Sequence, residues 1–500
     1  MQLRIALDRA SALGLRDQIV SQVAQLVHDK VLQPETKLPS CRNFSRELGV
    51  SINTVVAAFT KLEEQNLIYV KPRSGFYVSD ATLFPFVAEL NPEPETKGSA
   101  ISKRMNWRRQ TKDLNIIRRP QNWHDYKYPF VCNQVAEDTF PVSEWRECSR
   151  QAMNRRDLKI WSSDGLYSET NELVEQICTR ILPRRGVYSN VTRTMITLGS
   201  QNGIFIASQL LGGRNRIAVI EDPGYPDARK ILQASFGQVR FQRVDEEGMV
   251  VDENLRDATL VYVTPNRQFP TTVTMSEQRR KDLVAAAEEY DFFIIEDDYE
   301  CDLDYRHFTP FPLVSLCNQG RVIYLASMSK GLSPGLRLGY MSAAPEFTDT
   351  ARDARGTMMR HPPTLLQLTA ATFIRLGYYE SHLRRTLESS EKRWKIADKH
   401  LREKLPGFEI SGDFGGTNFL LSHRGRGITA SEVVQAAEQE GIVVEEVSPC
   451  FSDFEVGKYF FRLGVSALPT KDIEPGIKAL AKSLAHLTRY SAGNSNSQLG

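Results

Sequence analysis

The order of hydrophobic and polar positions divides the chain into three zones, and the first zone, residues 1–79, has a helical pattern. Apolar side chains recur there every three or four positions, which predicts one buried helix face at Leu15, Ile19, Val23, Leu26 and Val27. Ser40 is a typical N-cap for a second helix that ends before Gly49, and Ser51 is a typical N-cap for a third. The apolar runs I-Y-V and F-Y-V flank the turn K-P-R-S-G and predict a β-hairpin.

The second zone, residues 80–125, has the composition of a linker. It holds the polar, proline-containing run N-P-E-P-E-T-K-G-S, which favours an extended and mobile chain. Its basic residues leave two interpretations open: a solvated tether, or a tether that also holds DNA phosphates by releasing counterions. These residues, with Asp113 as the one acid among them, are Lys97, Lys103, Arg104, Arg108, Arg109, Lys112, Arg118 and Arg119.

The third zone, residues 126–490, alternates apolar strands with helical segments. The runs I-A-V-I-E-D-P-G, T-L-V-Y-V-T-P, F-F-I-I-E-D-D and R-V-I-Y-L-A-S are near-continuous and apolar, as in a parallel sheet buried on both faces. Ligands bind such sheets at the carboxyl ends of the strands. Shorter strands after a long helical stretch predict a smaller α+β lobe, and residues 491–500 are predicted to be a disordered tail.

Composition narrows the class of protein. A chain of 500 residues with 41% hydrophobic and 25% charged residues predicts two to four folded domains. Its seven scattered cysteines include no C-x-x-C pair, which indicates reduced thiols in a cytoplasmic protein. No apolar run is long enough for a membrane span, and Asp8 and Arg9 stand where a signal peptide would be apolar.

The segment S-M-S-K-G-L-S-P-G-L-R carries the clearest chemistry. Lys330 lies beside Ser327 and Ser329, and Arg337 follows seven positions later. A lysine in this setting forms a Schiff base with an aldehyde, while hydroxyls and a guanidinium hold a phosphate. Pyridoxal 5'-phosphate (PLP) carries both groups, so we expect this cofactor.

Two turns fit the same cofactor. L-G-S-Q-N-G, at residues 198–203, predicts a strand-to-helix turn whose amides, with Ser200 and Gln201, bind the phosphate. E-D-P-G-Y-P presents Tyr225 at a strand end, where it either stacks on the pyridine ring or packs the turn.

Two further segments supply charge. I-I-E-D-D-Y-E ends a buried strand, and we expect Asp297 to pair with the pyridine nitrogen and Tyr299 to reach the ring oxygen. No histidine or cysteine cluster lies near these acids, so no metal site is expected. Arg462, in the apolar run Y-F-F-R-L-G-V, needs an anion, which is either a ligand carboxylate or a structural Asp or Glu.

The first zone has the order of a winged helix-turn-helix. Its third helix is expected to enter the major groove of double-stranded operator DNA. The predicted DNA contacts are Arg42, Ser51, Asn53, Thr54, Arg73 and Gly75. A helical protein-interaction module is the alternative. The string K-L-P-S-C-R-x(4)-E-L-G-V-S-x-x-T-V resembles the GntR-type winged helix of bacterial transcription factors, with Ile52 where that family usually has arginine.

The third zone resembles a fold-type I aminotransferase, and the whole chain resembles the MocR/GabR-type regulators. The resemblance implies an α/β PLP-dependent transferase fold type I, with a large mixed-sheet domain and a small α+β lobe. It implies Lys330 as the internal aldimine lysine and Arg462 as the residue that binds the effector carboxylate. It also implies a homodimer with DNA-binding heads swapped between subunits. Relatives usually read T-P-S-H-Q-F-P-T-G, and this chain departs at Asn266, Arg267 and Thr272.

The expected function is therefore a transcriptional regulator that senses a small amino compound through external aldimine formation at Lys330, without net turnover. Two alternatives remain at this stage: a working aminotransferase with an accessory DNA head, and a DNA-binding protein with a cofactor-free scaffold. The sequence does not identify the effector, the operator, or the direction of regulation.

Overall fold

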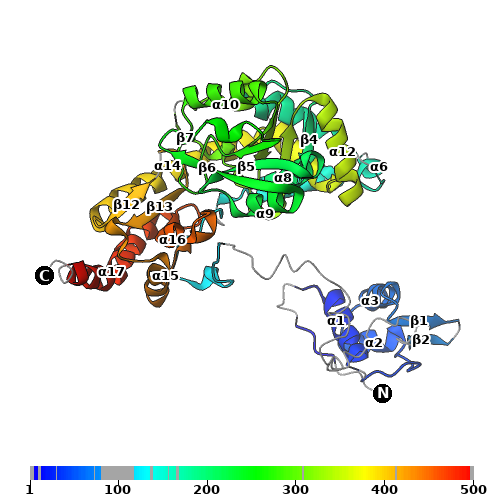
Figure 1. The fold of residues 1–500 in the computed structure, drawn as a ribbon. Helices are drawn as coiled ribbons and strands as arrows, with labels where there is room; N and C mark the ends of the chain where they lie inside the picture. The colour runs from blue at the N-terminus through cyan, green and yellow to red at the C-terminus, as the bar shows by residue number, and fades with distance from the viewer. Residues whose placement is uncertain are drawn as a thin grey trace, which may run out of the picture. The chain divides into compact units, whose positions relative to one another are not determined.

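The protein folds into two units, whose contacts divide the chain into residues 1–110 and 111–500. The computed structural model describes residues 5–8, 13–29, 31–72, 74–79, 117–135, 139–155, 157–164, 168–306, 309–411 and 414–495. Figure 1 shows the two units, coloured from the N-terminus to the C-terminus.

The first unit is a winged helix-turn-helix, as the sequence predicts. Its elements are α1 (Leu15–His28), α2 (Cys41–Leu48), α3 (Ile52–Glu64), β1 (Ile68–Lys71) and β2 (Gly75–Val78). Ser40 caps α2 by accepting from the backbone N–H of Asn43, and Gly49 ends it in the left-handed conformation. The two strands are antiparallel, and Lys71 pairs with Gly75 across the hairpin. The core is apolar and includes Ile19, Val23, Phe44, Phe59 and Leu62.

The second unit is built on a mixed sheet of eight strands in the order β4-β11-β10-β9-β8-β5-β6-β7. Strands β10, β9, β8, β5 and β6 are mutually parallel, whereas β11 is antiparallel to both its neighbours. The strands are β4 (Thr194–Thr197), β5 (Gly213–Asp222), β6 (Phe236–Asp245), β7 (Gly248–Met249), β8 (Leu260–Val263), β9 (Phe293–Asp298), β10 (Val322–Ser327) and β11 (Gly339–Ser342).

Helices cover both faces of this sheet, which explains the near-continuous apolar strands. On one face Ile220, Tyr262 and Ile295 pack against α8 (Ser200–Leu211), α9 (Pro226–Ser235) and α12 (Pro345–Met359). On the other face the alternate residues Val219, Val261 and Ile294 pack against α10 (Glu277–Glu289) and α11 (Leu313–Leu316). Figure 1 shows α10 and α9 on opposite sides of the strands. Further helices of this domain are α5 (Val142–Ala152), α6 (Leu158–Trp161), α7 (Asn171–Gln176) and α13 (Thr364–Arg375).

A smaller α+β lobe follows the long helix α14 (Tyr378–Lys404). Its four-stranded antiparallel sheet has the order β12-β13-β16-β15. A short parallel pair, β3 and β14, lies in the same apolar cluster as α14, α15 and α17. The remaining elements are β3 (Tyr128–Pro129), β12 (Phe408–Ser411), β13 (Asn418–His423), α15 (Ala430–Gln439), β14 (Ile442–Val443), β15 (Glu445–Glu446), α16 (Phe454–Gly457), β16 (Phe460–Gly464) and α17 (Thr470–Ser495).

Two boundaries differ from the sequence prediction. The last part of the predicted linker belongs to the second unit, because Ile117 packs against the apolar cluster around Phe269 and Leu420. Residues 80–116 of that linker lie outside the described residues. At the other end, α17 continues to Ser495, into the predicted disordered tail, because extending an existing helix needs no new nucleation. No described helix is both long and apolar enough to span a membrane.

Candidate cofactor and effector site

One cavity lies at the carboxyl ends of β8, β9 and β10, and residues predicted from four separate segments line it. Ligands are expected at this edge of a parallel sheet. The predicted residues among its lining are Ser200, Gln201, Tyr225, Asp297, Tyr299, Ser327, Ser329, Lys330 and Arg337. The sheet topology thus gathers side chains that are up to 137 positions apart, from Ser200 to Arg337.

Lys330 follows β10 and points among polar partners and one aromatic ring. Its Nζ contacts the Asn133 side-chain oxygen, lies 3.8 Å from Glu300 Oε1 and lies 4.7 Å from the Tyr299 ring centroid. Burial lowers the pKa of Lys330, while the charge of Glu300 raises it. A lysine with a lowered pKa is more often neutral, which is the form that attacks an aldehyde.

Asp297 is the second charged group of the cavity. The pleat of β9 separates the acids of E-D-D, because successive side chains point to opposite faces of a sheet. Asp297 Oδ2 accepts from the Tyr262 hydroxyl at 2.9 Å, whereas its buried Oδ1 has no hydrogen-bond partner among the described residues. Burial raises the pKa of Asp297 to about 7, against the lowering effect of the Tyr262 and Ser200 hydroxyls.

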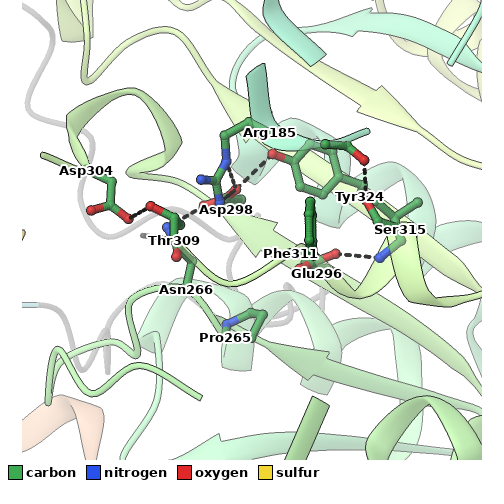
Figure 2. A network of polar contacts seen from close by, with 12 residues as sticks. Arg185, Pro265, Asn266, Glu296, Asp298, Asp304, Thr309, Phe311, Ser315 and Tyr324 are labelled. Carbon is green, nitrogen blue, oxygen red and sulfur yellow. Dashed lines mark hydrogen bonds and ion pairs between the residues drawn. The ribbon is translucent and has the colours of Figure 1, made fainter. Parts of the chain in front are cut away.

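The neighbouring acids of β9, Glu296 and Asp298, point to the opposite face of the sheet, where each accepts hydrogen bonds (Figure 2). Asp298 accepts from Arg185 at 2.9 Å, from the Tyr324 hydroxyl at 2.8 Å and from Asn266 at 3.2 Å. Glu296 accepts from the backbone N–H groups of Leu313 and Val314 at the start of α11. Of the three consecutive acids, Asp297 alone lines the cavity.

The start of α8 offers a second set of groups, which suit an anion of the size of a phosphate. Gly199, with φ 86°, is the N-cap of that helix, and a Cβ there would meet the Arg337 guanidinium at 3.0 Å. Arg337 Nη2 donates to the Leu198 carbonyl at 2.8 Å. The buried hydroxyl of Ser329 has no partner among the described residues, and Ser327 Oγ accepts from the Ser329 backbone N–H. A helix N-terminus, a guanidinium and free hydroxyls suit a phosphate.

Aromatic side chains form one wall. Tyr225 packs edge-on against Phe269, with ring centroids 5.3 Å apart, and its hydroxyl donates to Asp227 at 3.2 Å. Tyr299 also packs edge-on against Phe269, with ring centroids 6.2 Å apart. Tyr225 therefore lines the cavity and also packs the turn, and its stacking on a pyridine ring stays a prediction.

Arg462 lies one layer behind this wall. Its guanidinium lies 4.8 Å from the Phe269 ring centroid, and its Nε donates to Glu445 Oε2 at 2.7 Å. Glu445 is its cross-strand partner in β15. Of the two interpretations of Arg462, the structure thus contains the structural ion pair. Among the described residues Glu445 is the carboxylate that pairs with it, through Nε.

The sequence prediction missed several lining residues. Asn133, Tyr262, Thr264, Phe269 and Pro334 also line the cavity. Tyr262 offered one signal, since it is the polar-tipped residue within the buried strand L-V-Y-V. Glu300 was also missed, although it links Lys330 to the small lobe by accepting from Thr417 at 2.9 Å and from Asn418 at 3.2 Å.

The three departures from the usual T-P-S-H-Q-F-P-T-G pattern all lie at or near this junction. Arg267 Nε lies 3.8 Å from Glu300 Oε2, and its guanidinium is so close to Gly415 and Gly416 that a Cβ at either would meet it within about 3 Å. Thr272 occupies the left-handed region with φ 65°, which a glycine would adopt without strain. Asn266 bonds to Asp298 and Arg306. Arg267, at the position where the resemblance implies a histidine, thus lies against Gly415 and Gly416 of the small lobe.

The winged helix places its predicted DNA contacts as follows. Arg42 and Asn53 are exposed, near the starts of α2 and α3. Ser51 caps α3 by accepting from the Thr54 backbone N–H, and their two hydroxyls lie 2.8 Å apart, so these side chains are engaged within the helix start. Gly75 stands at the hairpin with φ 117°. Arg73 lies outside the described residues.

Comparisons with known proteins agree with both units. Residues 15–78 match the family described as bacterial regulatory proteins, gntR family, and residues 133–480 match aminotransferase class I and II. The HTH-type transcriptional regulator TauR of Rhodobacter capsulatus is 33% identical over 483 residues, which cover 95% of this chain and 98% of that protein. The probable rhizopine catabolism regulatory protein MocR of Rhizobium meliloti is 26% identical, covering 97% of this chain and 96% of that protein.

Solved structures resemble the second unit. The kynurenine aminotransferase of Pyrococcus horikoshii has a TM-score of 0.67 at 26% identity, covering 73% of this chain and 92% of that one. An archaeal alanine:glyoxylate aminotransferase has a TM-score of 0.66 at 25% identity, covering 71% and 90%. The fold and the cavity therefore define a winged-helix DNA-binding domain joined to an aminotransferase-like domain of the PLP-dependent class. The chain belongs to the family of MocR/GabR-type transcriptional regulators.

Proposed function

We propose that this protein is a PLP-dependent DNA-binding regulator that senses a small amino compound through external aldimine formation at Lys330. The observation that carries the proposal is that one cavity holds both a candidate Schiff-base lysine and a buried carboxyl group. Lys330 offers an amine of lowered pKa, and Asp297 offers a buried oxygen without a partner. Both lie in a chain whose other unit is a winged helix.

The residues present fit PLP. Asp297 Oδ1 suits a protonated pyridine nitrogen, which keeps the ring an electron sink and would pair the buried charge. Ser329, Arg337 and the start of α8 suit the phosphate, and Tyr225 suits one face of the ring. When bound, PLP supplies an aldehyde carbon that exchanges one amine for another. Lys330 would hold the cofactor through its Nζ, and that amine lies beside Glu300.

Glu300 supports the link between amine exchange and a change of conformation. It contacts Lys330, and it accepts from Thr417 and Asn418 at the start of the small-lobe strand β13. A charge that appears or disappears on Lys330 therefore acts on the contact between the large domain and the small lobe. An effector shifts DNA affinity only by binding two such states unequally. We propose that Arg462 Nη groups bind the effector carboxylate while Nε stays with Glu445.

The same proposal includes the assembly. We propose a homodimer in which each DNA-binding head associates with the neighbouring subunit, as the family resemblance implies. Two heads held by one dimer read two half-sites, so operator symmetry would mirror the symmetry of the protein. Sedimentation of the PLP-loaded chain at micromolar concentration would give twice the mass of 56.7 kDa. A monomer at that concentration would contradict this part.

A working aminotransferase is the second candidate, because the cavity retains Lys330, Asp297 and Arg337. A relative of Thermococcus litoralis called aromatic-amino-acid aminotransferase 1 is 29% identical over 70% of this chain. The experiment that separates the candidates incubates PLP-loaded protein with amino compounds and α-ketoglutarate. If the protein is a regulator, the amino compound changes its absorbance spectrum and its operator affinity without multiple turnovers. Turnover at about 1 per second or faster would favour the enzyme.

A further inference from the structure

The solvent-facing side of helix α3 has an unusual composition. Its buried side is formed by Val55, Ala58, Phe59 and Leu62, which belong to the core of the winged helix. The exposed positions recur one helical turn apart, so they form one face. From the start of the helix to Thr60 these exposed residues are Ile52, Asn53, Val56, Ala57 and Thr60, none of them charged, and the exposed Glu63 and Glu64 end the helix.

Two large apolar side chains dominate that face. Ile52 is 45% exposed and Val56 is 44% exposed, and neither belongs to the apolar core of the first unit. They stand four positions apart, so their side chains are neighbours about 6 Å apart along the helix axis. Helix propensity does not explain them, because β-branched residues are mediocre helix formers. Single exposed apolar residues are common, but two neighbouring exposed β-branched residues indicate a surface that binds a partner.

The charge around this face indicates what that partner is. Acidic residues normally gather in the first turn of a helix, where they stabilise its positive end. Neither α2 nor α3 has one there, and the acids of α3, Glu63 and Glu64, stand at its last residues. Arg42 and Arg46 of α2 are exposed. The starts of α2 and α3 carry no carboxylate, and α2 has exposed guanidinium groups, which suits a polyanion better than it suits another protein surface.

We propose that Ile52 and Val56 read thymine in the major groove of the operator, by packing against the 5-methyl groups of two different base pairs. Thymine is the DNA base with a methyl group at the major-groove edge, and apolar side chains recognise it by contact. Asn53, exposed beside Ile52, has the amide group that pairs with adenine. The recognition helix therefore selects an A·T-rich half-site. This inference rests on the proposed DNA-binding function and adds its sequence preference.

The test removes single methyl groups from the DNA. The full-length, PLP-loaded chain first selects its preferred site from a random duplex library. Deoxyuridine then replaces thymine at one position of that site at a time, which deletes the methyl group and keeps base pairing. At two positions the substitution should weaken binding about fourfold, the effect of one buried methyl group.

Protein variants show which side chain contacts which of the two thymines. Ile52→Ala should abolish the difference between thymine and deoxyuridine at one position, and Val56→Ala should abolish it at the other. Val31→Ala is the matched control, because Val31 is 56% exposed on the same unit but lies outside α3. This variant should keep both differences. Ile52→Arg should move the selected base from thymine towards guanine, which arginine binds through two hydrogen bonds.

Each contrary result has its own meaning. Equal affinity of the wild-type protein for thymine and deoxyuridine at every position overturns this inference and leaves the proposed function standing. Failure to select any sequence overturns both. If Ile52→Ala changes the sedimentation of the chain while the methyl dependence persists, the face is a contact between copies of the chain, and the inference is wrong.

Discussion

Lys330 Nζ lies 3.8 Å from Glu300 Oε1, and the same carboxyl group accepts hydrogen bonds from Thr417 and Asn418 of the small lobe. One acid thus touches the candidate Schiff-base lysine and the neighbouring lobe at once. Both side chains are largely removed from water, with 16% of Lys330 and 3% of Glu300 exposed, and the charge of Glu300 raises the pKa of Lys330.

Glu300→Gln should change how Lys330 reacts with added PLP. The charge of Glu300 raises the pKa of Lys330 against the lowering effect of burial, so its removal lowers that pKa further. The rate of covalent PLP attachment, followed against pH by borohydride trapping, should therefore reach its plateau at lower pH than in the wild type. Glu409→Gln, at an exposed position of β12, is the control and should leave the profile unchanged. An identical profile for Glu300→Gln would show that the two groups are not coupled.

Asp297→Asn should stabilise the cofactor-free protein at alkaline pH. Burial raises the pKa of Asp297 from 3.8 to about 7, so the folded state holds a proton that the unfolded chain releases. The cost of ionising it is absent below about pH 4, grows as the pH rises, and is complete above about pH 7. At pH 8 the variant should gain on the order of 4 kcal/mol in the free energy of unfolding, and it should lose PLP affinity.

Asp298→Asn is the matched comparison for that measurement. The Asp298 carboxylate is paired with Arg185 and accepts from Tyr324 and Asn266, so its loss leaves a buried guanidinium without its anion. This variant should lose about 3 kcal/mol of stability at pH 8. Chemical denaturation of both variants between pH 4 and pH 8 provides the data. A loss of stability in Asp297→Asn at pH 8 would contradict the raised pKa of Asp297.

Sequence reasoning identified most of the cavity because a parallel sheet brings strand ends together. Lys330, Asp297 and Tyr225 each follow an apolar run, so their common edge could be predicted from the order of the runs. Asn133 could not be predicted, because it reaches Lys330 from 197 positions away through a loop with no pattern of its own. The Glu445 partner of Arg462 depends on the register of two antiparallel strands, which the short run I-V-V-E-E did not define.

Arg462 can be tested for its two roles separately. Arg462→Ala should lower the free energy of unfolding by about 3 kcal/mol, because Glu445 is left buried without its cation. Arg462→Met combined with Glu445→Met replaces the pair by apolar side chains and should restore most of that stability. Both variants should lose the effector response, measured as the change in operator affinity. Recovery of the response in the double variant would leave Arg462 with a structural role alone.

Arg42→Ala should weaken operator binding and lower its dependence on salt. Arg42 is exposed at the start of α2, where a guanidinium is available to a phosphate. Loss of one phosphate contact should reduce the slope of log affinity against log salt by about 1. Arg16→Ala serves as the control, because Arg16 is already paired with Asp17 on α1 and should not affect the slope. An unaltered slope in Arg42→Ala would rule out the phosphate contact.

The most direct test of the account compares operator affinity with and without an active amino compound in the wild type and in Lys330→Ala. The compound is first chosen from an amino-acid library by its effect on the spectrum of the PLP-loaded protein. We expect the compound to shift the operator affinity of the wild-type protein and to have no effect on Lys330→Ala, which still folds and binds the operator. An equal shift in Lys330→Ala would show that amine exchange at Lys330 is not the signal.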